Sequence, residues 1–198
     1  MAVPLRDESE LEEPVIAAIC EGDRYAFEEF VRRQEAWVRA VIFSVLGRPD
    51  GVDDVAQNVW TSVWQRISKL RDTRSWRAWL HQLARNAAID AGREHTRRRF
   101  WGRAASIAAI EPSASSGGVD QRLTNDDERR DVLAAIQGLP AIYREPFVLR
   151  HMNDWSYRQI SEVMGLPVDA VETRLVRARR LLREVLAGRV EQNNVTSR

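Results

Sequence analysis

Apolar residues return at every third or fourth position along most of the first hundred residues, which predicts a series of amphipathic helices. A short helix over 13–21 ends at Gly22, and Asp23 is placed to cap the next helix. That second helix carries a long apolar stripe and stops at the breaker cluster 47–51.

Two further helices are predicted before residue 100. The third spans about 52–67, where β-branched residues lower helix propensity, so packing of an apolar stripe must hold it. Its expected inward residues are Val52, Val55, Val59, Val63, Trp64 and Ile67. After a loop, the fourth helix runs from about 76 to 99 with Trp79 and Leu83 facing inward.

The pattern dissolves between residues 102 and 124, where small residues favour a flexible linker. Periodicity then returns in a helix capped by Thr124 or Asn125, a helix up to about His151, and a helical hairpin broken at Gly165-Leu166-Pro167. No strand-like alternation is sustained, so we expect an all-α chain with two small helical domains joined by a flexible linker. The expected divisions are an N-terminal tail (1–12), a first domain (13–101), the linker (102–124), a second domain (125–187) and a frayed C-terminal tail (188–198).

The amino-acid composition limits the kinds of site that the chain can form. The chain has 198 residues, 44% of them hydrophobic, which supports packed cores; among its 30 basic residues only Lys69 is lysine. Arginine suits phosphate and guanine, although genomic base composition also enriches it. Cys20 is the only cysteine, which excludes an internal disulfide and a cysteine zinc site and favours a buried structural thiol. No leader or long apolar run is present, and the three histidines lack metal-ligand spacing, so we expect a soluble intracellular protein without a metal or cofactor.

The C-terminal hairpin has the form of a helix-turn-helix with its second helix fit for the major groove. Apolar positions at steps of three and four face inward: Val168, Val171, Leu175, Ala178 and Leu182. Arg174, Arg177 and Arg180 lie on the other face, where arginine can fork to guanine or hold phosphates. The alternative is an arginine-rich helix face that is only solvated.

The fourth helix and its flanks carry a second basic feature. Nine arginines against three acids lie between residues 71 and 103, with tryptophans interleaved. Basic grooves with aromatic platforms suit single-stranded nucleic acid. Trp76, at the loop edge, is the expected stacking residue, and Asn86 can hydrogen-bond a base edge.

The polar face of the third helix is different, because it is acidic and rich in amides. Nucleic acid should avoid Asp53 and Asp54, whereas a protein partner that presents arginines would fit them. A solvated face with acids near a helix N-terminus is the alternative.

The motifs together resemble the extracytoplasmic-function (ECF) group of bacterial sigma factors in the sigma-70 family. "DDVAQNVWTSVWQRI" is similar to the family pattern D-x-V-Q-E-x-F, and "SWRAWLHQLARNAAIDAGREHTRRR" to the helix that follows it. "LPAIYREPFVLRHMNDWSYRQISEVMGLPVDAVETRLVRARRLLRE" is similar to the family's final domain. The resemblance covers about residues 13–187, with two motif blocks in order.

The resemblance implies a transcription-initiation subunit rather than an enzyme, with residues 13–101 as sigma domain 2 and 125–187 as sigma domain 4. Implied partners are core RNA polymerase, through its β′ clamp coiled coil and β flap, promoter DNA and an anti-sigma factor. No membrane insertion and no small-molecule substrate are implied, and the implied location is the cytoplasm.

The resemblance also assigns residues. Polymerase contacts map to Asp54, Gln57, Asn58 and Thr61. Capture of the minus-ten non-template strand maps to Arg74, Trp76, Asn86, Asp90, Arg93 and Arg97. Reading of the minus-35 duplex maps to Glu172, Thr173, Arg174, Val176, Arg177 and Arg180. Two positions depart from the family: Asn58 replaces a common acid, and Glu172 replaces a common lysine or arginine, which leaves the promoter sequence open.

Two other functions compete with that of a transcription-initiation subunit. A two-domain repressor or activator would use the same helix-turn-helix without touching polymerase, and would bind a palindrome as a dimer. A nucleic-acid enzyme is disfavoured, because no paired carboxylates, Cys/His cluster or phosphate loop lies near the basic helix.

Overall fold

The structure, a computed structural model, describes residues 8–105, 123–152 and 154–196. Helices α1 (Glu8–Cys20), α2 (Arg24–Leu46), α3 (Val52–Arg66) and α4 (Trp76–Ala105) build the first half, with short 3₁₀ turns η1 (Ile67–Lys69) and η2 (Thr73–Ser75) between α3 and α4. Helices α5 (Leu123–Gly138), α6 (Ala141–Met152), α7 (Tyr157–Met164) and α8 (Val168–Thr196) build the second. The described residues contain helices and no strand, which confirms the all-α prediction.

Three expected element boundaries are wrong. Helix α5 begins at Leu123, so neither Thr124 nor Asn125 precedes it as a cap. Helix α4 runs on to Ala105, into the stretch expected to be linker; residues 106–122 of that linker lie outside the described residues. Helix α8 continues to Thr196, through most of the tail that was expected to be frayed.

Local signals explain the ends of α2. The Asp23 carboxylate accepts hydrogen bonds from the backbone N–H groups of Tyr25 and Ala26, at 2.9 and 3.0 Å, as predicted for an N-cap. At the other end Gly47 adopts a left-handed φ of 69° and its N–H donates to the carbonyl of Phe43. Glycine takes this conformation without the steric cost that a Cβ would bring.

The first half packs around α2. Its buried residues include Phe30, Val38 and Ile42, which meet the inward stripes of α3 and α4. The α3 stripe is confirmed at Val52, Val55, Val59, Val63 and Ile67, all buried. Trp64 was expected in that stripe but is 39% exposed, because it lies at the edge of the helix–helix contact.

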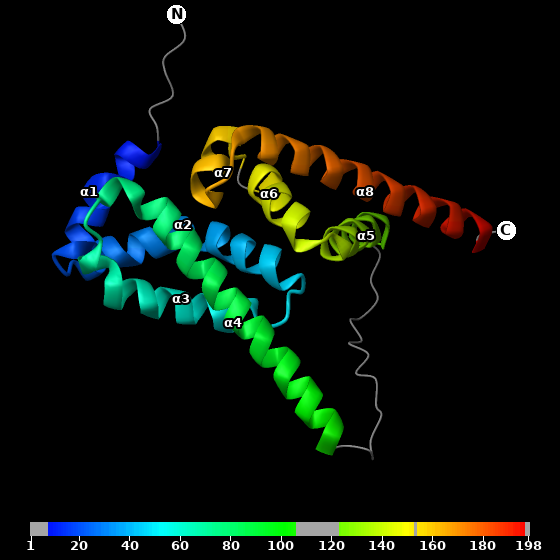
Figure 1. The fold of residues 1–198 in the computed structure, drawn as a ribbon, viewed down its shortest axis with the longest axis horizontal. Helices are drawn as coiled ribbons and strands as arrows, with labels where there is room; N and C mark the ends of the chain where they lie inside the picture. Colours follow the sequence, from blue (N-terminus) through cyan, green and yellow to red (C-terminus); the bar gives the residue numbers. More distant parts are fainter. Residues whose placement is uncertain (1–7, 106–122, 153, 197–198) are drawn as a thin grey trace, which may run out of the picture.

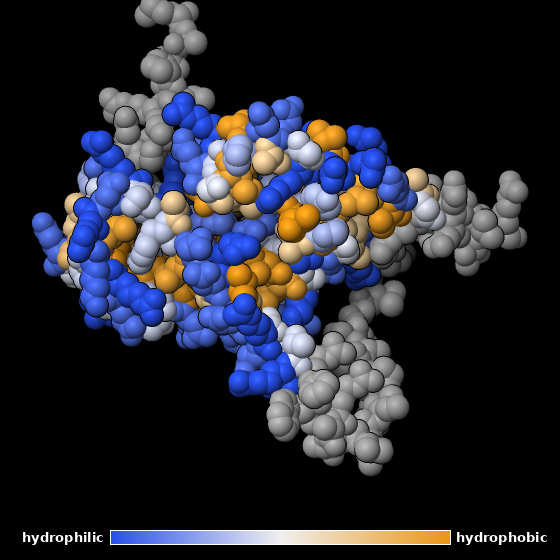
Figure 2. Space-filling view, viewed as in Figure 1, coloured by the Kyte–Doolittle hydropathy of each residue, from blue (hydrophilic) through white to orange (hydrophobic). Residues whose placement is uncertain are grey.

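The second half packs onto the first. Helix α6 lies between α2 and α8, so that one apolar cluster runs from Val38 through Val148 and Leu149 to Leu175 (Figure 1). A smaller cluster joins α5 to α8 through Ala135, Leu139, Ala178 and Leu182. The far half of α4 projects away from both, and hydrophilic side chains cover its described part (Figure 2). No helix among the described residues is both long and apolar enough to span a bilayer.

Candidate protein and nucleic-acid interfaces

The polar face of α3 is fully presented to solvent. All four residues that were predicted to bind a protein partner are exposed: Asp54, Gln57, Asn58 and Thr61. They share one side of the helix because the opposite side is buried against α2 and α4. The Thr61 hydroxyl donates to the Gln57 backbone carbonyl one turn earlier, at 2.9 Å.

An aromatic groove lies beside this face, between α2 and α3. Its volume is about 760 Å³, and its lining includes Phe27, Trp60 and Trp64 together with Gln57 and Thr61. The rings of Phe27 and Trp64 are 4.9 Å apart between centroids. Exposed aromatic surface beside polar groups is typical of protein-binding sites. The sequence pattern missed this groove because it assigned Trp64 to the core.

The structure contradicts the prediction that Trp76 is part of the nucleic-acid site. It was expected at the loop edge as a base-stacking platform, but it is 1% exposed. Its ring lies 5.2 Å from that of Phe30 and 6.1 Å from that of Trp37, both in edge-on geometry. The first turn of α4 sits on α2, so Trp76 belongs to the core and cannot stack on a base in this conformation. Trp79 is partly buried against the same core.

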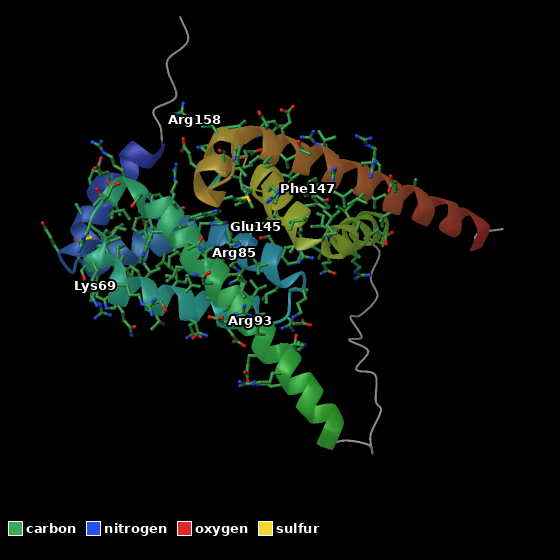
Figure 3. The ribbon with its side chains drawn as sticks, viewed as in Figure 1. Lys69, Arg85, Arg93, Glu145, Phe147 and Arg158 are labelled. Atoms are coloured by element: carbon green, nitrogen blue, oxygen red, sulfur yellow. The ribbon has the colours of Figure 1, made fainter. Side chains whose placement is uncertain are left out.

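The other predicted minus-ten residues share one exposed face of α4. Asn86, Asp90, Arg93 and Arg97 follow one another at steps of four, three and four, and each is exposed. The Arg93 guanidinium lies 3.8 Å from the Asp90 carboxylate, and Arg97 pairs with Glu94. Figure 3 shows Arg93 at the point where α4 leaves the body of the molecule.

The loop before α4 is braced by α1, which the sequence did not indicate. The Asp72 carboxylate accepts from the Arg74 backbone N–H at 3.0 Å, and the Thr73 hydroxyl donates to Glu13 at 3.1 Å. Glu13 also lies 3.6 Å from the Arg74 guanidinium, whose side chain is otherwise exposed. Contacts across 60 residues of sequence leave no local signal, so only the fold reveals that Glu13 supports Arg74.

The helix-turn-helix is formed by α7 and α8. Ser156 and Gln159 make a capping box at the start of α7, and Gly165 ends it with a φ of 64°. The inward stripe of α8 is confirmed for Val171, Leu175, Ala178 and Leu182, all buried. Val168 is 42% exposed, because it opens the helix ahead of the contact with α7, so its place in the stripe was wrong.

The outer face of α8 carries the predicted minus-35 residues. Glu172, Thr173, Val176, Arg177 and Arg180 are exposed, whereas Arg174 is partly buried toward α4 and α6. The Arg177 guanidinium donates to the Tyr143 hydroxyl at 3.3 Å, a partner on α6 that the sequence did not indicate. Arginines with exposed heads on one helix face can meet phosphates and base edges.

Two family models match the chain in order. The model described as Sigma-70 region 2 matches residues 30–98, and the model described as Sigma-70, region 4 matches residues 129–182. The chain belongs to the sigma-70 family. Region 2 therefore contains α3 and the exposed face of α4 from Asn86 to Arg97, and region 4 contains the helix-turn-helix. Promoter recognition in transcription initiation is the function that accompanies this membership.

Curated relatives assign this sigma factor to the ECF group. It is 31% identical over 173 residues to a probable RNA polymerase sigma factor RfaY of Xanthomonas campestris, covering 86% of this chain but 42% of that longer protein. It is 25% identical to the ECF sigma factor SigW of Bacillus subtilis, covering 86% and 94% of the two chains. It is 27% identical to the ECF sigma-E factor of Escherichia coli, covering 83% and 88%.

Solved structures share the fold. The structure of CnrH in complex with the cytosolic domain of CnrY matches with a TM-score of 0.64 at 25% identity, covering 89% of this chain and 97% of CnrH. RpoE of Bartonella quintana, in complex with the anti-sigma factor NepR, matches with a TM-score of 0.57 at 23% identity, covering 81% and 96%. Among the described residues no group of three or more His, Cys, Asp or Glu is arranged to hold a metal ion.

Proposed function

We propose that this sigma factor docks on core RNA polymerase through the exposed face of α3 and gives the polymerase its promoter address. The observation that carries the proposal is the contrast within one helix. Val55, Val59 and Val63 anchor α3 in the core, and Asp54 and Gln57 stand outward on the opposite side. An acidic and amide face of this kind complements a partner that presents arginines, such as the β′ clamp coiled coil implied by the family resemblance.

The second part of the proposal concerns the minus-ten element. The exposed series Asn86, Asp90, Arg93 and Arg97 would contact the non-template strand, and Arg74 would approach it from the braced loop. Stacking on Trp76 is excluded from this proposal by its burial. Capture of separated bases would offset part of the unpairing cost during promoter opening.

The third part concerns the minus-35 element. The outer face of α8 would enter the major groove, with Arg177 and Arg180 nearest to base edges and phosphates. Glu172 is exposed on this face and can accept from a cytosine amino group. Neither region reads much sequence alone, so joining them on one chain and one polymerase raises affinity through effective concentration. The β flap is the implied polymerase contact of region 4.

An anti-sigma factor is the proposed inhibitor. The Bartonella relative is solved with the anti-sigma factor NepR. The aromatic groove beside Gln57 and Thr61 would suit an apolar segment of such a partner, which would then compete with polymerase for α3. In this scheme the chain carries no chemistry of its own; the polymerase supplies catalysis, and the site of action is the cytoplasm, where bacterial polymerase works.

The deciding experiment is binding of the purified chain to bacterial core polymerase by size-exclusion chromatography, with Asp54→Arg as the test variant. We expect the wild-type chain to co-migrate with core and Asp54→Arg to lose at least tenfold in affinity, because the new cation opposes an arginine-bearing partner. Glu21→Arg, the same charge reversal at an exposed acid outside α3, should bind as the wild type does. Equal binding by all three chains would rule out α3 as the docking face. Tight DNA binding by the wild-type chain without any polymerase would indicate a repressor.

A further inference from the structure

Tyr143 of α6 lies beside the outer face of α8, although it is outside the set of residues predicted to read the minus-35 element. Helix α6 packs along α8 (Figure 1), and the partly buried Tyr143 ring contacts the cluster that includes Leu139 and Ala178. This packing gives the Tyr143 hydroxyl a fixed position at the edge of α8. The exposed Arg177 guanidinium donates to that hydroxyl through Nη1, at 3.3 Å.

Arg177 differs from its neighbour Arg180 in the charge of its partner. Arg180 lies 3.5 Å from the Glu184 carboxylate, an ion pair that offsets its charge. Among the described residues Arg177 has no ion-pair partner and no hydrogen-bond partner besides Tyr143. Asp169 lines the same cavity but lies two turns earlier, about 12 Å along the helix at 1.5 Å per residue. A carboxylate would compete with DNA for the guanidinium, whereas the neutral hydroxyl of Tyr143 holds it and leaves its charge intact.

The contact with Tyr143 leaves free the edge of Arg177 that a guanine needs. A guanidinium carries five N–H donors in a planar fork. Tyr143 accepts one of them at Nη1, so that Nε and Nη2 keep their hydrogens for a bidentate contact with guanine O6 and N7. Holding a long, flexible side chain before DNA arrives lowers the entropy that is lost on binding.

Residues of α6 and α8 surround one space at this position. A cavity of about 390 Å³ is lined by Ile142 and Tyr143 of α6 and by Thr173, Arg174 and Arg177 of α8, among others. Three of these residues belong to the predicted minus-35 set. A base edge or phosphate that reaches Arg177 therefore arrives next to Tyr143, so the start of α6 belongs to the same surface as the outer face of α8.

We propose that Tyr143 is a positioning residue for minus-35 recognition: its hydroxyl holds the Arg177 guanidinium in the orientation that reads a base edge, without neutralising it. This inference rests on the function proposed above, because it deepens the role given there to Arg177. Removal of the hydroxyl leaves the charge of Arg177 in place but frees the guanidinium to move. Discrimination between sequences then falls, while the general attraction to DNA stays.

The test variant is Tyr143→Phe in the full chain, which deletes the hydroxyl and keeps the ring in its cluster. The probes are a promoter selected by the wild-type holoenzyme from a random library and variants of that promoter with single substitutions across the minus-35 element. Competition transcription with core polymerase gives the ratio between the selected promoter and each variant. We expect Tyr143→Phe to lower the largest of these ratios by about two- to tenfold, the factor associated with ordering one long side chain.

The salt dependence of promoter binding provides a second readout. Tyr143→Phe should leave it as in the wild type, because the charge of Arg177 is unchanged and no phosphate contact is lost. A weaker salt dependence would show that a phosphate contact was lost, and the positioning role would be wrong.

Tyr157→Phe is the matched control. The Tyr157 hydroxyl also accepts from an arginine, Arg179, at 3.2 Å, but Arg179 lies outside the predicted reading set, so the promoter ratios should be unchanged. The double variant Tyr143→Phe/Arg177→Ala should discriminate as well as Arg177→Ala alone, because the tyrosine has no guanidinium left to hold. Equal losses in the two tyrosine variants, or losses that add in the double variant, would overturn the proposal.

Arg177→Ala separates this inference from the proposed function. If Arg177→Ala lowers the promoter ratios and Tyr143→Phe does not, Arg177 reads the promoter without help from Tyr143, and only the present inference is wrong. If neither variant changes any ratio, Arg177 does not read the minus-35 element, and that part of the proposed function is wrong as well.

Discussion

His81 of region 2 and Glu145 of region 4 lie 3.2 Å apart, and their side chains are 1% and 6% exposed. Burial raises the pKa of Glu145, but His81 and then Arg85 stabilise the charged carboxylate and outweigh it, so that the pKa of Glu145 lies below its ordinary value. The charged groups around this carboxylate come from α4 and, across the adjoining cavity, from Arg174 of α8.

The contact between α4 and α6 should therefore weaken in acid. A group whose pKa is depressed in the folded chain stabilises the fold above its ordinary pKa, about 4.3 for Glu, and loses this contribution as the pH falls through the depressed value. We expect the free energy of unfolding in urea to keep the Glu145 contribution from pH 8 to 5 and to lose it below pH 4.5. Glu145→Gln removes the titrating group and should flatten this pH dependence; the same curve in Glu145→Gln would contradict the assignment.

Trp76 and Trp64 should differ sharply in their effect on stability. Trp76→Ala removes a fully buried ring that contacts Phe30 and Trp37, and we expect a loss of about 3–5 kcal/mol in the free energy of unfolding. Trp64→Ala removes a ring that is 39% exposed and should cost about 1 kcal/mol or less. Urea unfolding followed by circular dichroism measures both. Equal losses would show that Trp76 is not a core residue.

The burial of Trp76 could not be predicted from the sequence. Periodicity identified the α8 stripe from Val171 to Leu182, because each buried position repeats within its own helix. Trp76 stands at a helix start, where no period is established, and its burial is decided by Phe30 and Trp37 on a helix far away in the sequence.

The contact between regions 2 and 4 was likewise not predictable from the sequence. Arg144 and Glu145 sit within a motif that indicates the family, but nothing local shows that both charges are buried against region 2. The exposed faces of α3 and α8 could be predicted, since an exposed face is the complement of a buried stripe. Contacts that depend on two distant segments, such as Arg177 with Tyr143, required the fold.

The outer face of α8 should set minus-35 selectivity. Arg177→Ala should weaken discrimination between promoter variants by about 1–3 kcal/mol, which is a factor of about 5 to 150, because a forked base contact would be lost. Arg183→Ala removes an exposed arginine outside the predicted reading set and should leave selectivity intact. Competition transcription between paired minus-35 sequences with reconstituted polymerase measures the ratio. A uniform drop on all sequences would instead make Arg177 a phosphate contact.

Cys20 should react slowly with thiol reagents. Burial, and then the negative charge of Glu21, raise the pKa of the Cys20 thiol, and its Sγ donates to the Ile67 carbonyl at 3.3 Å. An ordinary cysteine has a pKa of about 8.5. At pH 8 the fraction of Cys20 present as the reactive thiolate is therefore smaller than that of an ordinary cysteine. We expect alkylation roughly tenfold slower in the native chain than in urea, with a rate that keeps rising above pH 9. Equal rates in the native chain and in urea would mean that the fold does not shield the Cys20 thiol.

Reconstituted transcription tests the central claim most directly. Core polymerase is incubated with a random promoter library, with and without the purified chain, and transcript starts are sequenced. We expect defined starts that require the chain, lie downstream of one shared pair of sequence elements, and disappear with Asp54→Arg. If the folded wild-type chain neither co-migrates with core polymerase nor produces a single chain-dependent start, α3 is not a polymerase-docking face and the proposed function is contradicted.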